Sequence, residues 1–239
     1  MVLLTLACSF LRLTFILILV LFITRQFKIA SKQYLVLFFL VVLVDDLLLR
    51  TVPAPILFQE LRWNWFGKLV DFSAAVVFVV FYKGLSRKEY GITLSLEKGS
   101  LKPVVISILG FIFLTTLSGI GGEFHLPSRE TILYQLTMPG LSEELIFRGI
   151  LLALLNKTYG TPWKLWGAHL GWGAIITTLL FGLVHGLSFS PSYEFQFNLG
   201  AILATGAAGL FFVWLKERSK SLLPGILAHN LSNVIIQFF

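Results

Sequence analysis

The chain has 239 residues, of which 56% are hydrophobic and only 13% are charged. Soluble domains carry about 25% charged residues, so this composition excludes an ordinary soluble domain and indicates an integral membrane protein. The formal net charge is +7, but the basic residues form short clusters between apolar runs, which is typical of membrane topology rather than of nucleic-acid binding.

Long apolar runs predict an all-α, polytopic membrane protein with about eight transmembrane helices, because a helix needs about 20 mostly apolar residues to cross a bilayer. In chain order the expected helices are 3–24, 34–50, 69–83, 103–120, 131–155, 168–188, 198–215 and 222–239. Between the second and third, two prolines and Trp63, Trp65 and Phe66 indicate a segment at the membrane interface. We expect the protein in the cell membrane.

The lysines and arginines of the connecting segments predict the orientation. Most follow the first, third, fifth and seventh helices: Arg25, Lys28, Lys32, Lys83, Arg87, Lys88, Lys98, Lys102, Lys157, Lys164, Lys216, Arg218 and Lys220. The other connecting segments hold Arg50, Arg62, Lys68 and Arg129. Since basic residues favour the cytoplasmic side, both termini are expected outside.

Three charges lie inside the fifth expected helix, in the stretch LSEELIFRGI. A charge at the bilayer centre costs about 2.5–3.5 kcal/mol on insertion scales, so such residues are rarely without a role. Glu144 and Arg148 are four apart and share a helix face, which predicts an ion pair, whereas Glu143 needs another use. The alternative is a purely structural salt bridge, with Glu143 facing water. Pro139 and Gly140 predict that the helix begins there, after an interfacial segment.

Two further polar sites occur in later helices. His185 ends the sixth expected helix one turn after Phe181, and His229 and Asn233 are four apart in the last one. Each site alone is also typical of an interfacial histidine or of polar residues that join helices. Together they favour a hydrated cavity, because antiparallel packing brings Glu143 and His185 to a similar depth, where His229 and Asn233 approach from the opposite direction.

The ordered motifs EELIFR, FGLVH and HNLSN resemble those of the CAAX-protease and bacteriocin-processing family, the intramembrane endopeptidases that include the Ras-converting prenyl-protein protease. The resemblance covers residues 131–239, which are expected to form a catalytic helical core. Residues 1–130 are expected to form N-terminal membrane helices and an amphipathic connector. The family implies a hydrolase, a CAAX-type protease that cleaves a peptide bond of a membrane-associated peptide or protein.

Carried over to this sequence, the resemblance gives each motif residue a role. Glu143 and His185 would orient and deprotonate a water molecule, and His229 and Asn233 would donate hydrogen bonds to the oxyanion. The remaining motif residues would support the shape of the site: Glu144, Arg148 and Phe181.

The resemblance favours a glutamate-type mechanism without a cofactor, but zinc stays open as an alternative. Glu143, His185 and His229 supply the two imidazoles and one carboxylate of a catalytic zinc site. The helical His-Glu-x-x-His arrangement of soluble zinc proteases is absent, and the single cysteine, Cys8, excludes a cysteine-rich metal site.

Two other functions remain possible on the same residues. One is a non-catalytic membrane adaptor or immunity protein on the same fold. The other is a proton-coupled transporter that uses Glu143 and His185 as a relay, which inverted repeats would support, although none is visible. The expected partners are a peptide or membrane-protein substrate and the lipid bilayer, and no nucleic acid.

Overall fold

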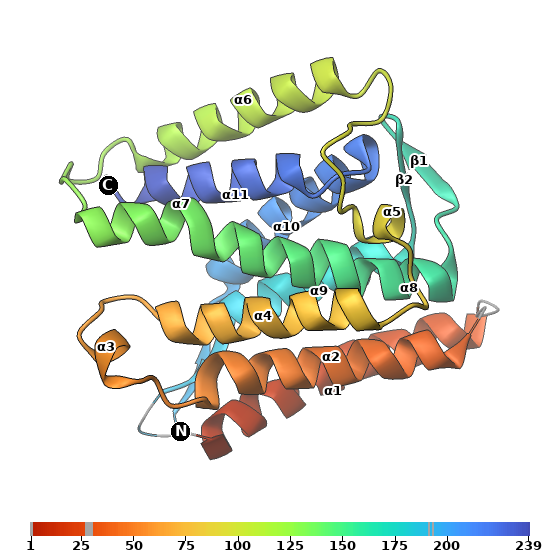
Figure 1. The fold of residues 1–239 in the computed structure, drawn as a ribbon, viewed down its shortest axis with the longest axis horizontal. Coiled ribbons are helices and arrows are strands. Elements are labelled where there is room, and N and C mark those ends of the chain that lie inside the picture. The colour runs from red at the N-terminus through yellow and green to blue at the C-terminus, as the bar shows by residue number, and fades with distance from the viewer. Residues whose placement is uncertain (1, 27–30, 191, 193) are drawn as a thin grey trace.

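The computed structural model describes residues 2–26, 31–190, 192 and 194–239, and Figure 1 shows that it is mostly helical, in agreement with the all-α expectation. The long helices are α1 (Val2–Gln26), α2 (Lys32–Thr51), α4 (Trp65–Phe81), α6 (Leu101–Gly119), α7 (Arg129–Glu143), α9 (Trp172–Gly186), α10 (Leu199–Ser219) and α11 (Leu223–Ile236). Each overlaps one expected span. Lys28, used above for the orientation, lies outside the described residues.

Shorter elements connect these helices. Two single-turn helices, α3 (Ile56–Gln59) and α5 (Arg87–Tyr90), flank α4, and α7 continues into the π-helix η1 (Glu144–Leu151) and then α8 (Leu152–Tyr159). Two antiparallel hairpins, which the sequence did not predict, pair β1 (Trp163–Leu165) with β2 (Ala168–Leu170) and β3 (Leu187–Phe189) with β4 (Phe195–Phe197).

Among the described residues, three helices are long and apolar enough to cross a membrane: Leu3–Gln26, Leu101–Gly119 and Leu199–Ser219. Large apolar side chains on α1 and α6 are exposed, including Phe22 and Phe113, as expected for surfaces that face lipid. The protein is therefore an integral membrane protein, while the expected total of eight spans stays a prediction.

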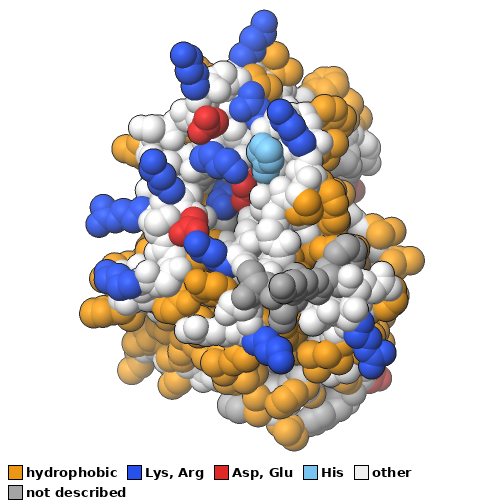
Figure 2. Space-filling view, turned by 90° about the vertical axis from the view of Figure 1, so that its right-hand side faces the viewer, with side chains coloured by type: hydrophobic (Ala, Val, Ile, Leu, Met, Phe, Trp, Pro, Cys, Tyr) orange, Lys and Arg blue, Asp and Glu red, His pale blue; other side chains and the backbone are white. Residues whose placement is uncertain are grey.

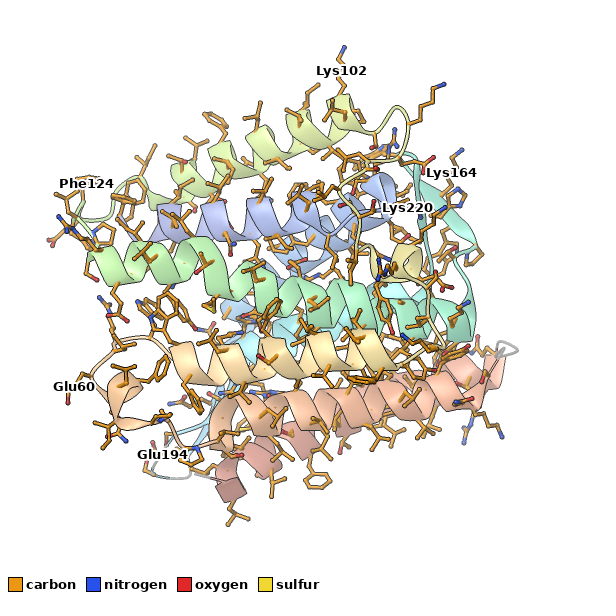
Figure 3. The ribbon with its side chains drawn as sticks, in the orientation of Figure 1. Glu60, Lys102, Phe124, Lys164, Glu194 and Lys220 are labelled. Carbon is orange, nitrogen blue, oxygen red and sulfur yellow. The ribbon has the colours of Figure 1, made fainter. Side chains whose placement is uncertain are left out.

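The two ends of the molecule differ in charge. Lys102, Lys164 and Lys220 lie at one end and Glu60 and Glu194 at the other (Figure 3). Figure 2 looks onto the first end and shows lysine and arginine side chains gathered there. The basic connecting segments of the sequence thus meet at one end, as alternating helix directions require.

Buried polar contacts tie the first two helices to the rest of the chain. Arg12 on α1 is 1% exposed; it pairs with Asp46 on α2 at 3.1 Å and donates to the Leu187 carbonyl at 2.6 Å. One buried apolar cluster likewise contains residues from both parts of the chain, among them Phe38 and Leu145. The division at residue 130 stays a prediction.

Pro139 does not begin a helix, contrary to the sequence-based expectation. α7 starts at Arg129, where Ser128 accepts a hydrogen bond from the Thr131 amide at 3.1 Å, and it runs through the proline without a break. Proline removes one helical hydrogen bond and crowds the preceding turn. The amide of the next residue, Gly140, donates to Oδ1 of Asn230 on α11 at 2.7 Å, so α11 supports the helix at this point.

Candidate active site

A cavity of about 550 Å³ lies between α4, α6, α7, α9, α10 and α11. The residues predicted from sequence that line it are Glu143, Phe181, His185, His229 and Asn233. Three different helices contribute these side chains, because α11 packs against α7 while α9 packs against η1, the continuation of α7. The structure thus brings together the residues to which the sequence assigned the chemistry.

Glu143 ends α7, and its two carboxylate oxygens have different surroundings. Oε1 lies 2.7 Å from Nζ of Lys68. Oε2 is buried without a hydrogen-bond partner, 3.8 Å from Nε2 of His185 and 3.9 Å from Nε2 of His229. These last distances are too long for direct hydrogen bonds and suit groups that hold a small molecule between them.

Hydrogen bonds on the far side of each imidazole fix which ring nitrogen faces Glu143. Nδ1 of His185 lies 2.7 Å from the Phe181 carbonyl, and Nδ1 of His229 lies 2.8 Å from Oε1 of Glu144. Both partners are acceptors, so Nδ1 carries the hydrogen in each ring. Nε2 of each histidine is therefore an acceptor in the neutral ring and a donor only in the imidazolium.

Glu144 and Arg148 form the expected ion pair and lie behind the cavity. Arg148 Nη1 is 3.1 Å from Glu144 Oε1, and both side chains are 1% exposed. Arg148 also donates to the Gly209 carbonyl at 3.1 Å, and its guanidinium lies 4.2 Å from the centre of the Phe181 ring. The pair therefore holds His229 through Glu144 and Phe181 through Arg148.

A π-helix begins between the two adjacent glutamates, whose side chains already point in different directions because an α-helix has 3.6 residues per turn. Glu144 is the first residue of η1, the eight-residue π-helix that follows α7. A π-helix widens the backbone turn, and such insertions are frequent at functional sites. Glu143 faces the cavity from the last turn of α7, whereas Glu144 turns inward to Arg148.

Aromatic rings restrict the two histidines differently. Phe212 stacks on His229 with a centroid distance of 4.9 Å, and the His229 side chain is 7% exposed. The Phe181 and His185 ring centroids are 4.5 Å apart, but the His185 side chain is 33% exposed. The cavity is thus closed at His229 and reaches the surface beside His185.

Sequence reasoning missed two residues at this site. Lys68, which the sequence assigned to a connecting segment, lies in the first turn of α4 and lines the cavity. Asn230, next to His229, holds Gly140 on α7 through Oδ1. Lys68 begins an apolar run, and a charge at that position is a weak signal for burial. Asn230 gives no signal beyond its place as the first asparagine of HNLSN.

Zinc does not fit the side chains well as they stand. In the described part of the chain, no three metal-binding side chains of the histidine, cysteine or carboxylate type are grouped to hold an ion. Tetrahedral zinc ligands lie about 3.3–3.5 Å apart, closer than Glu143 Oε2 to either imidazole. Lys68 also presents a positive charge to the carboxylate that would bind the ion.

Comparison with known proteins identifies the part of the chain that carries these residues. Residues 128–235 match the family model described as "Type II CAAX prenyl endopeptidase Rce1-like". No curated protein and no solved structure gives a match to the chain. The matched segment contains all three motifs and runs from the start of α7 almost to the end of α11. This segment is therefore similar to the prenyl endopeptidases of that model, in agreement with the resemblance of its three motifs to the CAAX-protease and bacteriocin-processing family.

Proposed function

We propose that the protein is an intramembrane endopeptidase that hydrolyses a peptide bond of a membrane-associated peptide or protein. The family match supports a protease. The observation that carries the proposal is the unpaired Oε2 of Glu143, which faces Nε2 of His185 and of His229 in one cavity. The carboxylate oxygen lies 3.8–3.9 Å from each of the two imidazole nitrogens, an arrangement that suits the activation of one water molecule.

In this mechanism a water molecule lies between Glu143 and His185 and attacks the carbonyl carbon of the scissile bond. Its proton passes to Oε2 of Glu143, while the lone pair on Nε2 of His185 orients the second hydrogen. Glu143 then delivers the proton to the departing amine as the carbon–nitrogen bond breaks. The proton therefore returns from the carboxylate to the product, and no other reactant is consumed.

The oxyanion is bound from α11. Asn233 donates its side-chain amide, and His229 donates from Nε2 as an imidazolium, whose opposite nitrogen is held by the Glu144 carboxylate. Such donors act most strongly where water is excluded, and loss of one typically costs about 10²–10³ in rate. The buried, stacked position of His229 provides that environment.

The substrate reaches the site from the end of the molecule that carries few basic residues. His185 is next to the last residue of α9, and Lys68 lies in the first turn of α4. Figure 1 shows that α4 begins beside α3, at the end of the molecule where Figure 3 labels Glu60 and opposite the end that carries Lys102 and Lys220. With the basic end in the cytoplasm of a cell-membrane protein, the site opens towards the outside.

Comparison of peptide termini in cells tests this function. Cells that express the chain are compared with cells that express Glu143→Gln or His185→Ala, and new peptide ends are identified by mass spectrometry in membranes and medium. Exposed residues of the same types give the matched controls Glu123→Gln and His125→Ala. We expect a set of cleavage products that both site variants lose and both controls keep.

Other outcomes point to the alternatives. If both site variants keep every cleavage product, the protease proposal is wrong. A cellular phenotype that persists in both variants then favours a non-catalytic adaptor. Proton flux into liposomes that depends on Glu143 favours the transporter.

A further inference from the structure

The structure assigns one more residue to this site. We infer that Lys68, on α4 and outside the family-matched residues 128–235, is a positioning residue that keeps Glu143 ionised and directs its free oxygen to the imidazoles. The inference rests on the proposed role of Glu143 as the base. It makes the N-terminal helices part of the active site rather than a membrane anchor for it.

The direct contact is the first observation. Lys68 Nζ donates to Oε1 of Glu143 at 2.7 Å, and the side chains are 9% and 16% exposed. An ammonium has three donors and no acceptor, so it binds one carboxylate oxygen without competing for the lone pairs of the histidines. With Oε1 held, Oε2 is the oxygen left to face the cavity.

A second contact one turn along α4 fixes the same register. Asp71 Oδ2 accepts a hydrogen bond from Ser142 Oγ at 2.5 Å, and Ser142 immediately precedes Glu143. α4 therefore contacts two successive residues at the end of α7, through side chains three residues apart on one helix face. A sliding motion of α4 that moved Lys68 away from Glu143 would also break the buried Asp71–Ser142 bond.

The start of α4 is anchored to its neighbours by its own sequence. Asn64 caps the helix by accepting from the Gly67 amide at 2.9 Å and donates to the Leu49 carbonyl at 2.8 Å. A Cβ on Gly67 would lie 2.4 Å from that carbonyl, so only glycine permits this approach of α4 to α2. Lys68, the next residue, is thereby held at a fixed position relative to α2.

The preceding tryptophans bind the start of α7. Glu130 accepts hydrogen bonds from the Trp63 amide and from Nε1 of Trp65, each at 3.2 Å. The Trp63 ring stacks on Tyr134 with a centroid distance of 5.1 Å, and both rings line the cavity with Lys68. α4 and α7 are thus joined at both sides of the Lys68–Glu143 contact.

The charge balance shows why Glu143 needs this partner. The titratable or charged groups around the pair are Tyr134, Asp71, Asp45, His185, His229, Glu144 and Arg148. Arg148 is paired with Glu144, and both imidazoles lie 3.8–3.9 Å from the carboxylate, so Lys68 is the cation in hydrogen-bond contact with Glu143 among the described residues. Burial disfavours an ionised carboxylate, and a cation in hydrogen-bond contact opposes that effect. Without Lys68, Glu143 takes up a proton at higher pH and can no longer accept one from water.

The test measures the pH dependence of kcat/KM for purified, reconstituted protein acting on a peptide found by the terminus comparison. Lys68→Met and Lys68→Gln should move the acid limb of the profile to higher pH by about one unit or more, the effect typical of a close opposite charge. Below the midpoint of the acid limb, activity should then fall about tenfold for each pH unit by which the limb moves, while activity on the plateau at higher pH should change little. Lys68→Arg should keep the acid limb near its normal position.

Lys216 gives a matched control. It is also a buried lysine paired with a carboxylate, Glu217, at 2.8 Å, but it does not line the active-site cavity. Lys216→Met should leave the pH profile unchanged, even if it lowers thermal stability.

Several results would overturn the inference. A normal acid limb in Lys68→Met or Lys68→Gln shows that Lys68 does not act on Glu143, whatever the overall rate. If neither neutral variant yields folded protein while Lys216→Met does, Lys68 is only structural. Full activity of Glu143→Gln would instead overturn the proposed function itself.

Discussion

Removal of Arg148 should destabilise the fold more strongly than an ordinary substitution. In Arg148→Met an unbranched apolar side chain replaces the arginine stem, but Glu144 loses the guanidinium 3.1 Å away. The variant also removes the donor to the Gly209 carbonyl and the cation over the Phe181 ring. Glu144 is then a buried carboxylate whose hydrogen-bond partner is His229.

The magnitude follows from the burial of both partners. Breaking a buried ion pair by removing one partner costs about 3–5 kcal/mol, because an uncompensated charge stays in the interior. For a chain of this length, about 1 kcal/mol shifts Tm by roughly 2–4 °C, so the expected loss is about 6–20 °C. The double variant Glu144→Gln/Arg148→Met removes both charges and should be less destabilised than Arg148→Met alone.

The single cysteine provides the assay. Cys8 is buried, so a thiol-reactive fluorescent dye reports unfolding of the detergent-solubilised protein as temperature rises. Lys157→Met is the control, since its partner Glu89 and Lys157 itself are more than one-third exposed and such a pair is worth about 1 kcal/mol or less. A loss in Arg148→Met no larger than in Lys157→Met, or a double variant less stable than Arg148→Met, would refute this reasoning.

Three further predictions concern chemistry, metal and orientation. Asn233→Ala should lower kcat by a factor of about 10²–10³ with little change in KM. A variant with unchanged kcat and a KM raised by a similar factor would contradict the role of Asn233 at the oxyanion. Activity should survive 1,10-phenanthroline treatment, whereas a loss that added zinc restores would support the metal alternative. In a Cys8→Ala background, Phe124→Cys should react with a membrane-impermeant maleimide on intact cells and Lys220→Cys only after permeabilisation; the reverse pattern would contradict the assigned orientation.

The helices were accessible from sequence because each is a local apolar run. Hydropathy and length suffice to find α1, α6 and α10, and the four-residue spacing of Glu144 and Arg148 suffices to predict their contact. Such features depend on residues close together in the chain.

Contacts between distant residues were not accessible in the same way. Lys68 stands where an apolar run begins, and hydropathy assigns such a position to a connecting segment. Its burial depends on an ion pair with Glu143, which is 75 residues away in the sequence. Pro139 signals a helix start in isolation, but Asn230 supports the helix through it from 90 residues further along. Local propensity is overridden where a tertiary contact satisfies the disrupted group.

The hairpins were missed for a related reason. β1 with β2 and β3 with β4 are strands of three residues each, too short to show an alternating pattern. They lie at helix ends, where the apolar pattern of the neighbouring helices dominates the sequence.

Oxygen labelling in a single turnover tests the central claim, that Glu143 activates water rather than attacking the peptide bond itself. Excess enzyme is mixed with substrate in H₂¹⁸O, and the product and the peptide containing Glu143 are weighed by mass spectrometry. We predict one ¹⁸O atom in the new carboxyl group of the product and none in Glu143. Product that carries only ¹⁶O, together with labelled Glu143, would contradict the mechanism.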